Sequence, residues 1–182
     1  MIWSVWMVLP WFASVAWAET TTPYQVEGPA RVLAGDILDI EDQRPYRNPR
    51  FDAQVRVHVR GVDAPEPSQT CIVEEKRWWF CGTAAQQALS QWINNRPVLC
   101  TALATTEQDR TFGVCRVGQE DLATWLVAHG WALADPKTGE RYLPLEEKAK
   151  KDRVGIWKSR FEPPWEFRKQ SETLYDWGKS EE

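Results

Sequence analysis

The segment 53–60 alternates apolar and polar residues strictly, which is the period of a strand that is buried on one face. Its valines share one face and its basic residues the other: Val55, Val57 and Val59 against Arg56, His58 and Arg60. A glycine and two prolines follow in 61–67, and such a stretch cannot continue a central strand. The chain therefore contains a half-buried strand that carries three potential cations and ends in a rigid polar loop.

The remaining patterns predict a small mixed domain. Residues 25–40 read as two strands joined by a tight turn at Ala34-Gly35-Asp36, and 98–104 and 111–117 as two more around a polar turn. Apolar residues at helical spacing predict helices at 83–94, 121–129 and 143–153. Five strands with a helix after the third predict an α+β, mainly β fold: a five-stranded OB-fold barrel with about three helices.

The N-terminal residues 1–18 have no charged side chain and close on the small-x-small pattern Ala16-Trp17-Ala18. This is typical of a signal peptide that is cleaved after Ala18. A membrane anchor is the alternative, but Pro10 interrupts the apolar run, which is short for a span of about 20 residues. We expect a secreted or periplasmic protein without stable membrane insertion.

The rest of the chain has the length of one domain, which we place at 19–168, followed by a charged C-terminal tail at 169–182. The net charge of -4 argues against broad adhesion to nucleic acid, so a site for a polyanion must be local. We expect a monomer.

The chain has four cysteines, Cys71, Cys81, Cys100 and Cys115. An even number in an exported chain favours disulfides. Three pairings are possible, and the one that joins sequence neighbours closes two short loops, each worth about 2–3 kcal/mol. A zinc site is disfavoured because the chain has no Cys-x-x-Cys and neither histidine lies near a cysteine.

Six short motifs, taken together, resemble the staphylococcal nuclease, or thermonuclease-like, family in order and spacing. They are Gly35-Asp36, Gly-Val-Asp-Ala-Pro-Glu at 61–66, Cys81-Gly82, Asp121-Leu122, the run 130–134, and Gly155-Ile156-Trp157 with Phe161. The resemblance extends from about Val26 to Arg168. It implies the staphylococcal-nuclease type of OB fold and hydrolysis of phosphodiester bonds in single-stranded or locally melted DNA or RNA.

The resemblance also implies a set of site residues. Asp36, Asp63 and the backbone carbonyl of Ala64 are expected to bind Ca²⁺, which prefers oxygen ligands. Glu66 is expected to orient or deprotonate the attacking water, and Arg110 to stabilise the transition state. Without the resemblance, the same acids read as a turn residue, a strand-end cap and a solvated loop residue.

The chain departs from the family pattern at three places. His58 stands where the family has a second catalytic arginine, Ala34 stands where it often has another aspartate, and the turn 106–110 lacks the usual tyrosine and glycine. In place of the missing arginine, Arg60, Arg56 or a charged His58 is then expected to contact the phosphate of the substrate. If His58 serves, activity falls as pH rises through its pKa, ordinarily about 6.5.

These departures leave a second hypothesis open. The chain is either a nuclease or a non-catalytic OB module of the cell envelope that binds nucleic acid, an oligosaccharide or a protein on the same face. The aromatic run Trp78-Trp79-Phe80 is read either as packing or as a stacking platform.

Overall fold

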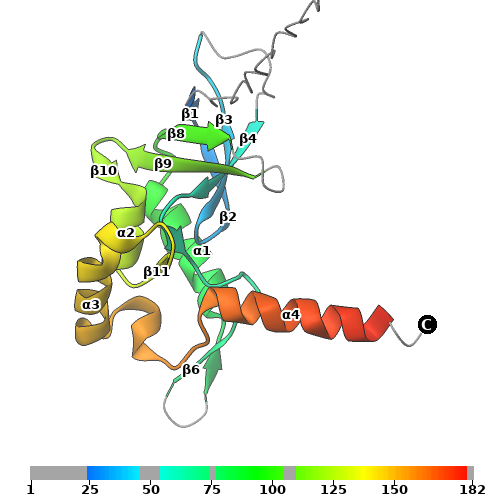
Figure 1. Cartoon of the computed structure of the whole chain (residues 1–182). Coiled ribbons are helices and arrows are strands. Elements are labelled where there is room, and N and C mark those ends of the chain that lie inside the picture. Colours follow the sequence, from blue (N-terminus) through cyan, green and yellow to red (C-terminus); the bar gives the residue numbers. More distant parts are fainter. Residues whose placement is uncertain (1–23, 46–53, 74–76, 105–109, 180–182) are drawn as a thin grey trace, which may run out of the picture.

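The computed structural model describes residues 24–45, 54–73, 77–104 and 110–179. A curved sheet forms the upper part of the molecule in Figure 1. Its strands follow the order β1 (Tyr24–Gly28), β8 (Val98–Ala104), β9 (Thr111–Val117), β4 (Gln54–Val59), β3 (Ile37–Glu41) and β2 (Ala30–Ala34), with β10 (Glu120–Asp121) paired to β9. All neighbours are antiparallel except β4 and β9, which run parallel. Strands occupy all of the predicted stretches, but 25–40 contains three strands instead of the predicted two.

Within the described residues the sheet does not close into a barrel, because the ladder of hydrogen bonds stays open between β1 and β2. These two strands are consecutive in the chain and are separated only by Pro29, which has no N–H to donate and has a fixed φ. The chain therefore bends at Pro29 and pairs first with β8 and then with β3. Backbone hydrogen bonds from Glu41 N to Pro29 O (3.0 Å) and from Gln43 N to Glu27 O (2.9 Å) join the bend and β1 to the end of β3 and the residues that follow it.

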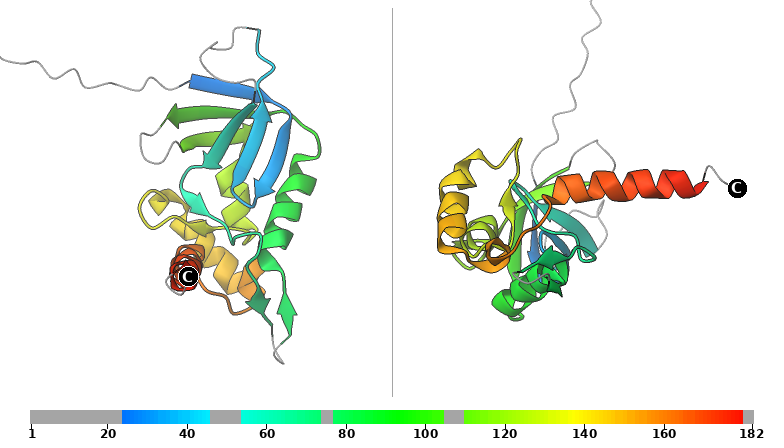
Figure 2. Two further views of the ribbon diagram at one scale, coloured as in Figure 1. Left: turned by 90° about the vertical axis from the view of Figure 1, so that its right-hand side faces the viewer. Right: turned by 90° about the horizontal axis from the view of Figure 1, so that it is seen from below.

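Four α-helices surround the lower end of the sheet (Figures 1 and 2). They are α1 (Cys81–Ile93), α2 (Leu122–Ala128), α3 (Leu143–Asp152) and α4 (Pro164–Lys179), and short 3-10 turns occupy Glu140–Tyr142 and Gly155–Lys158. The carboxylate of Asp121 caps α2 by accepting a hydrogen bond from Thr124 N (2.7 Å). The first three helices were predicted from their spacing.

Helix α4 is the main departure from the sequence-based expectation of about three helices. The helix begins at Pro164, and proline is favoured in the first turn, where its missing N–H has no partner to lose. Its first turns lie against the domain and the remainder projects away from it (Figures 1 and 2). Residues from the end of the chain therefore reach the body of the domain.

The described residues form two apolar cores. The larger one lies between the sheet and helices α1 and α2, and it includes Leu38, Val57, Leu89 and Leu126. The smaller one surrounds a disulfide, Leu133 and Ile156, and is covered by the aromatic side chains Trp79, Trp131, Trp157, Phe161 and Trp165. Of the aromatic run, Trp79 thus packs, whereas Trp78 and Phe80 are exposed.

The disulfides join sequence neighbours. Cys100 pairs with Cys115 across β8 and β9, where the two residues face each other in the register. Cys71 pairs with Cys81 and closes the hairpin of β6 (Cys71–Ile72) and β7 (Trp78–Trp79) at the start of α1. The remaining short strands, β5 (Val62–Asp63) and β11 (Leu133–Ala134), pair with each other.

Within the described residues, no helix is long and apolar enough to cross a membrane. The predicted signal peptide at 1–18 lies outside the described residues. Its cleavage after Ala18 stays a prediction.

We predict that Gly82→Ala destabilises the fold, although alanine is favoured over glycine in a helix by about 1 kcal/mol. A Cβ atom at Gly82 would lie 1.6 Å from the carbonyl oxygen of Glu66, so the loop that carries Glu66 must move away from α1. The expected loss is about 1–3 kcal/mol of unfolding free energy in urea titrations. The control Gln87→Ala, at an exposed position of the same helix, should change little. Unchanged stability in Gly82→Ala would show that this close approach is absent.

Candidate active site

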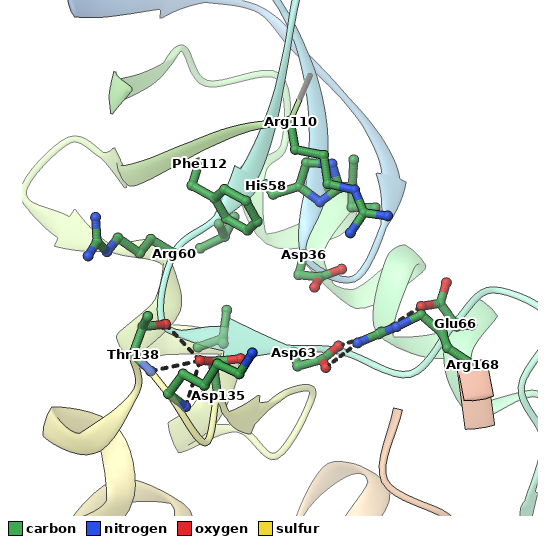
Figure 3. A pocket seen from close by; sticks show the side chains of 15 residues that line it. Asp36, His58, Arg60, Asp63, Glu66, Arg110, Phe112, Asp135, Thr138 and Arg168 are labelled. Atoms are coloured by element: carbon green, nitrogen blue, oxygen red, sulfur yellow. Dashed lines mark hydrogen bonds and ion pairs between the residues drawn. The ribbon is translucent and has the colours of Figure 1, made fainter. Parts of the chain in front are cut away.

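The candidate site is a pocket of about 560 Å³ at the lower end of β4 (Figure 3). Six of the predicted site residues line it: Asp36, His58, Arg60, Asp63, Glu66 and Arg110. They come from the β2–β3 turn, from β4 and the loop that follows it, and from the start of β9. The fold thus brings together residues that are up to 74 positions apart in the chain, from Asp36 to Arg110.

Asp36 is placed by a close approach of the β2–β3 turn to the loop after β5. Gly35 allows this approach, because a Cβ atom there would lie 2.7 Å from the Cβ of Ala64. The Asp36 Oδ2 atom accepts a hydrogen bond from Ala64 N (3.4 Å), and the Asp36 carbonyl accepts one from Val59 N (2.8 Å). The turn, the end of β4 and the Asp63 loop are therefore fixed to one another.

Asp63 and Glu66 share one partner, Arg168 of α4 (Figure 3). The Nη1 atom of Arg168 donates to Asp63 Oδ1 (2.9 Å) and to Glu66 Oε1 (2.7 Å), and Nη2 donates to Asp63 Oδ2 (2.6 Å). The side chain of Asp63 is 7% exposed, that of Glu66 28% and that of Arg168 40%. The guanidinium is bidentate toward Asp63, the strongest common form of such a pair.

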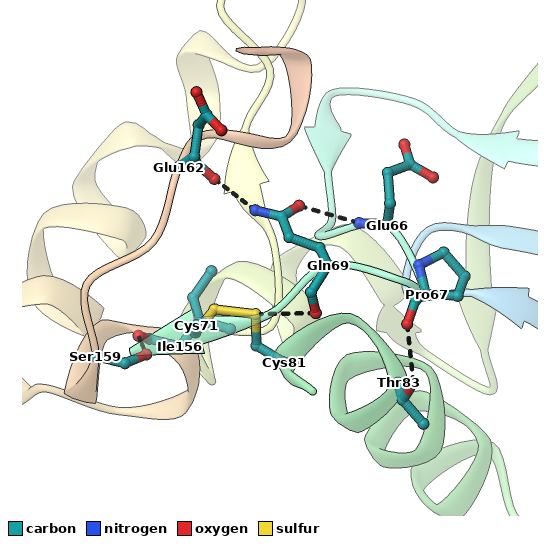
Figure 4. Close-up of a disulfide and its surroundings, with 9 residues drawn as sticks. All are labelled: Glu66, Pro67, Gln69, Cys71, Cys81, Thr83, Ile156, Ser159 and Glu162. Carbon is teal, nitrogen blue, oxygen red and sulfur yellow. Dashed lines mark hydrogen bonds between the residues drawn. A yellow bond between two sulfur atoms is a disulfide. The ribbon is translucent and has the colours of Figure 1, made fainter. Parts of the chain in front are cut away.

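A buried glutamine connects the Glu66 loop to the start of α4 (Figure 4). Gln69 is 1% exposed, its Oε1 accepts from Glu66 N (3.3 Å), and its Nε2 donates to the carbonyl of Glu162 (2.6 Å). Two backbone hydrogen bonds of 2.8 Å between Ile72 and Arg160 hold the same segment against β6. The position of Arg168 is thus set by a network that also sets Glu66.

The acidic groups of the site repel one another. Burial, and then the nearby charge of Asp63, raise the pKa of Asp36 to about 7. The smaller effect of Glu66 acts in the same direction, whereas the hydrogen bond from Ala64 and the charge of Arg168 oppose it. At neutral pH, Asp36 is therefore a mixture of its charged and neutral forms.

His58 is not suited to replace the missing arginine at neutral pH. Its pKa is lowered first by burial and then by the positive charge of Arg110, with smaller effects from Arg56 and Arg168. The imidazole packs against the ring of Phe112, with 5.4 Å between ring centroids. His58 is thus mostly uncharged at pH 7.

The neighbouring arginines of β4 do not take over this role. Arg56 is paired with Asp39 on the sheet surface, with 2.8 Å from Nε to Oδ1, and does not line the pocket. Arg60 lines the pocket, but its guanidinium points away from Asp36 and Glu66 (Figure 3). Arg110, in contrast, points toward Asp36 in the same view.

A family model, described as staphylococcal nuclease homologue, matches residues 56–159, which is more than half of the chain. The chain belongs to the staphylococcal nuclease-like family. It is also 29% identical over 135 residues to the succinoglycan biosynthesis protein ExoI of Rhizobium meliloti (strain 1021), an alignment that covers 72% of this chain and 64% of that protein. The chain thus spans slightly less than two thirds of this relative's length.

The family implies calcium, but the residues as arranged here do not fit a calcium ion. Both carboxylate oxygens of Asp63 and one of Glu66 already accept hydrogen bonds from Arg168, and a cation there would be repelled by the guanidinium. Within the described residues, no group of three His, Cys, Asp or Glu side chains is arranged to hold a metal. Ala64 contributes its N–H to Asp36, and the role of its carbonyl as a ligand stays a prediction.

Several residues that complete the pocket were not predicted from the sequence. Arg168 comes from α4, and Asp135, Lys137 and Thr138 come from the loop after β11. Asp135 Oδ1 organises this loop by accepting from Lys137 N (2.9 Å) and Thr138 N (2.7 Å). Pro163-Pro164 is typical of the start of a helix, and this pattern could have indicated that Arg168 lies on a helix.

We predict that His58 titrates below its usual pKa of 6.5 and that Arg110→Ala raises its pKa. Burial and the Arg110 charge both disfavour the imidazolium, so removing that charge relieves part of the shift. NMR of the imidazole carbon-bound protons against pH measures the midpoint. A midpoint at or above 6.5 in the wild-type protein, or one that Arg110→Ala leaves unchanged, would contradict this electrostatic account.

Proposed function

We propose that this protein is a nuclease that hydrolyses phosphodiester bonds of single-stranded or locally melted DNA or RNA. Membership in the family supports a nuclease or nucleic-acid-binding function. The observation that carries the proposal is that one pocket brings three of its carboxylates, Asp36, Asp63 and Glu66, together with three arginines, Arg60, Arg110 and Arg168. Hydrolysis of a phosphodiester requires such a combination of a base and fixed positive charge.

The geometry suggests a role for each group. Glu66 is partly exposed, and Arg168 contacts its Oε1, so Oε2 is available to accept the proton of a water. That water attacks phosphorus, the bond to the leaving oxygen breaks, and the leaving oxygen takes a proton from solvent. Arg110 points into the pocket from the opposite side, where it can contact the phosphoryl oxygens as charge develops on them.

We also propose that the protein acts outside the cytoplasm, as a secreted or periplasmic monomer. Its two disulfides are compatible with an oxidising compartment. Its relative from Rhizobium meliloti is named for succinoglycan biosynthesis, and this name does not state a nuclease activity. The family implies calcium dependence, whereas the pairing of Asp63 and Glu66 with Arg168 argues against it.

The second candidate function is a non-catalytic module that binds nucleic acid, an oligosaccharide or a protein through the same pocket. Two observations favour it: an uncharged His58 takes the place of a catalytic arginine, and Arg168 occupies oxygens of Asp63 and Glu66. Such a module would bind its ligand without turnover.

We predict that Glu66→Gln lowers kcat for cleavage of single-stranded DNA by about 100-fold or more, because loss of a general base typically costs 10²–10⁴. Glutamine keeps the size of the side chain and removes a negative charge, so the fold should be nearly unchanged and the affinity for DNA should not fall. The rate is measured with labelled oligonucleotides, and affinity by fluorescence anisotropy.

The matched control is Glu120→Gln, which removes the same charge at an exposed position of β10. It should cleave like the wild type. Binding without cleavage in the wild-type protein would support the module instead, and equal cleavage by wild type and Glu66→Gln would remove Glu66 from the mechanism.

A further inference from the structure

The contact of Arg168 with both Asp63 and Glu66 has no counterpart among the site residues that the family resemblance implies. It places a fixed positive charge between the expected metal ligand and the expected base. We propose that the Arg168 guanidinium takes the place of a divalent cation in this pocket and binds the phosphate of the substrate directly. This inference rests on the proposed function and names the group that holds its substrate.

The hydrogen-bonding capacity of Arg168 is sufficient for this role. A guanidinium has five N–H donors, and three of them serve Asp63 and Glu66 in the described part of the chain. Two donors therefore remain for a phosphate oxygen, and the side chain is 40% exposed at the pocket. The planar guanidinium matches phosphate geometry better than a point charge does.

The charge balance of the pocket depends on Arg168. The charged residues that line it are four acids and four bases: Asp36, Asp63, Glu66 and Asp135 against Arg60, Arg110, Lys137 and Arg168. Without Arg168, Asp63 and Glu66 lose the guanidinium that pairs with both of them, and their unneutralised charges repel a phosphodiester. With Arg168 in place, a phosphate can enter without a metal ion to offset these carboxylates.

Arg168 is held in place by the same contacts that hold the loop of Glu66. Gln69 joins Glu66 N to the carbonyl of Glu162, and Trp165 packs on the core around the Cys71–Cys81 disulfide. A side chain that only filled the empty pocket and left when substrate bound would not need such a connection to the loop that carries Glu66. The network instead keeps the guanidinium in position before substrate arrives, which is what electrostatic preorganisation requires.

The test compares wild type, Arg168→Ala, Arg168→Lys and Lys169→Ala, each checked for folding by its melting curve. Lys169 is the matched control, because it is exposed, adjacent on α4 and carries the same charge without lining the pocket. Two quantities are measured in chelator: cleavage of single-stranded DNA, and its affinity by anisotropy with Glu66→Gln introduced into every variant. A third is the change in melting temperature on adding calcium.

In chelator, wild type and Lys169→Ala should cleave equally, whereas Arg168→Ala should lose about 100-fold or more in kcat/KM, as for removal of one transition-state donor. Arg168→Lys should fall between them because it keeps charge but not the planar fork. Arg168→Ala should also bind DNA more weakly. Calcium should raise the melting temperature of Arg168→Ala, whose Asp63 and Glu66 are no longer paired, and leave that of the wild type unchanged.

Two results would overturn the proposal. Faster cleavage by Arg168→Ala than by wild type in chelator would make Arg168 an inhibitory contact. A calcium-induced rise in the melting temperature of the wild type would show that a cation binds despite the guanidinium.

Failure of the nuclease function itself is distinguishable. If the wild type cleaves nothing, yet DNA binding in chelator is lost in Arg168→Ala and kept in Lys169→Ala, the phosphate-binding role stands and hydrolysis does not. If binding is equal in both variants, the role of Arg168 is refuted.

Discussion

Arg168 forms ion pairs with Asp63 and Glu66 at one end of the sheet. These pairs offset the repulsion among the carboxylates of Asp36, Asp63 and Glu66, which lie close together there. Asp63 is almost fully buried, and a buried charge without a partner is strongly destabilising. One guanidinium neutralises it and also contacts Glu66, while burial keeps Asp36 partly protonated at neutral pH. Arg168 of α4 therefore completes a site whose acidic residues come from much earlier in the chain.

Several structural features serve this arrangement. Gly35 and Gly82 allow the hairpin turn and α1 to approach the loop around Asp63 and Glu66, at distances that a Cβ atom would prevent. The Cys71–Cys81 disulfide fixes the hairpin that pairs with Arg160, a few residues before α4 begins. Gln69 then links Glu66 to the entry of α4. Features that are far apart in the sequence, from Gly35 to Arg168, thus position the same site.

Much of the fold and part of the site could be predicted from local patterns. The alternation at 53–60 and the proline-rich stop after it gave β4 and the loop that carries Asp63 and Glu66, because strand period and chain breakers act within a few residues. The bend at Pro29 was not predicted. The chain changes its pairing partner there from β8 to β3, and this change depends on strands that are distant in sequence. Arg168 was missed for the same reason, since its partners lie about a hundred positions earlier and its helix was taken for a tail.

The central claim, that this pocket hydrolyses phosphodiester bonds, is tested most directly by incubating the folded, disulfide-bonded chain with single-stranded DNA and RNA. The products are separated by size, and their new phosphorylated ends are identified by mass spectrometry. We expect new ends in at least one of the two nucleic acids, formed in the presence of chelator as well as with calcium. Intact substrates under both conditions would contradict it and would favour a binding module.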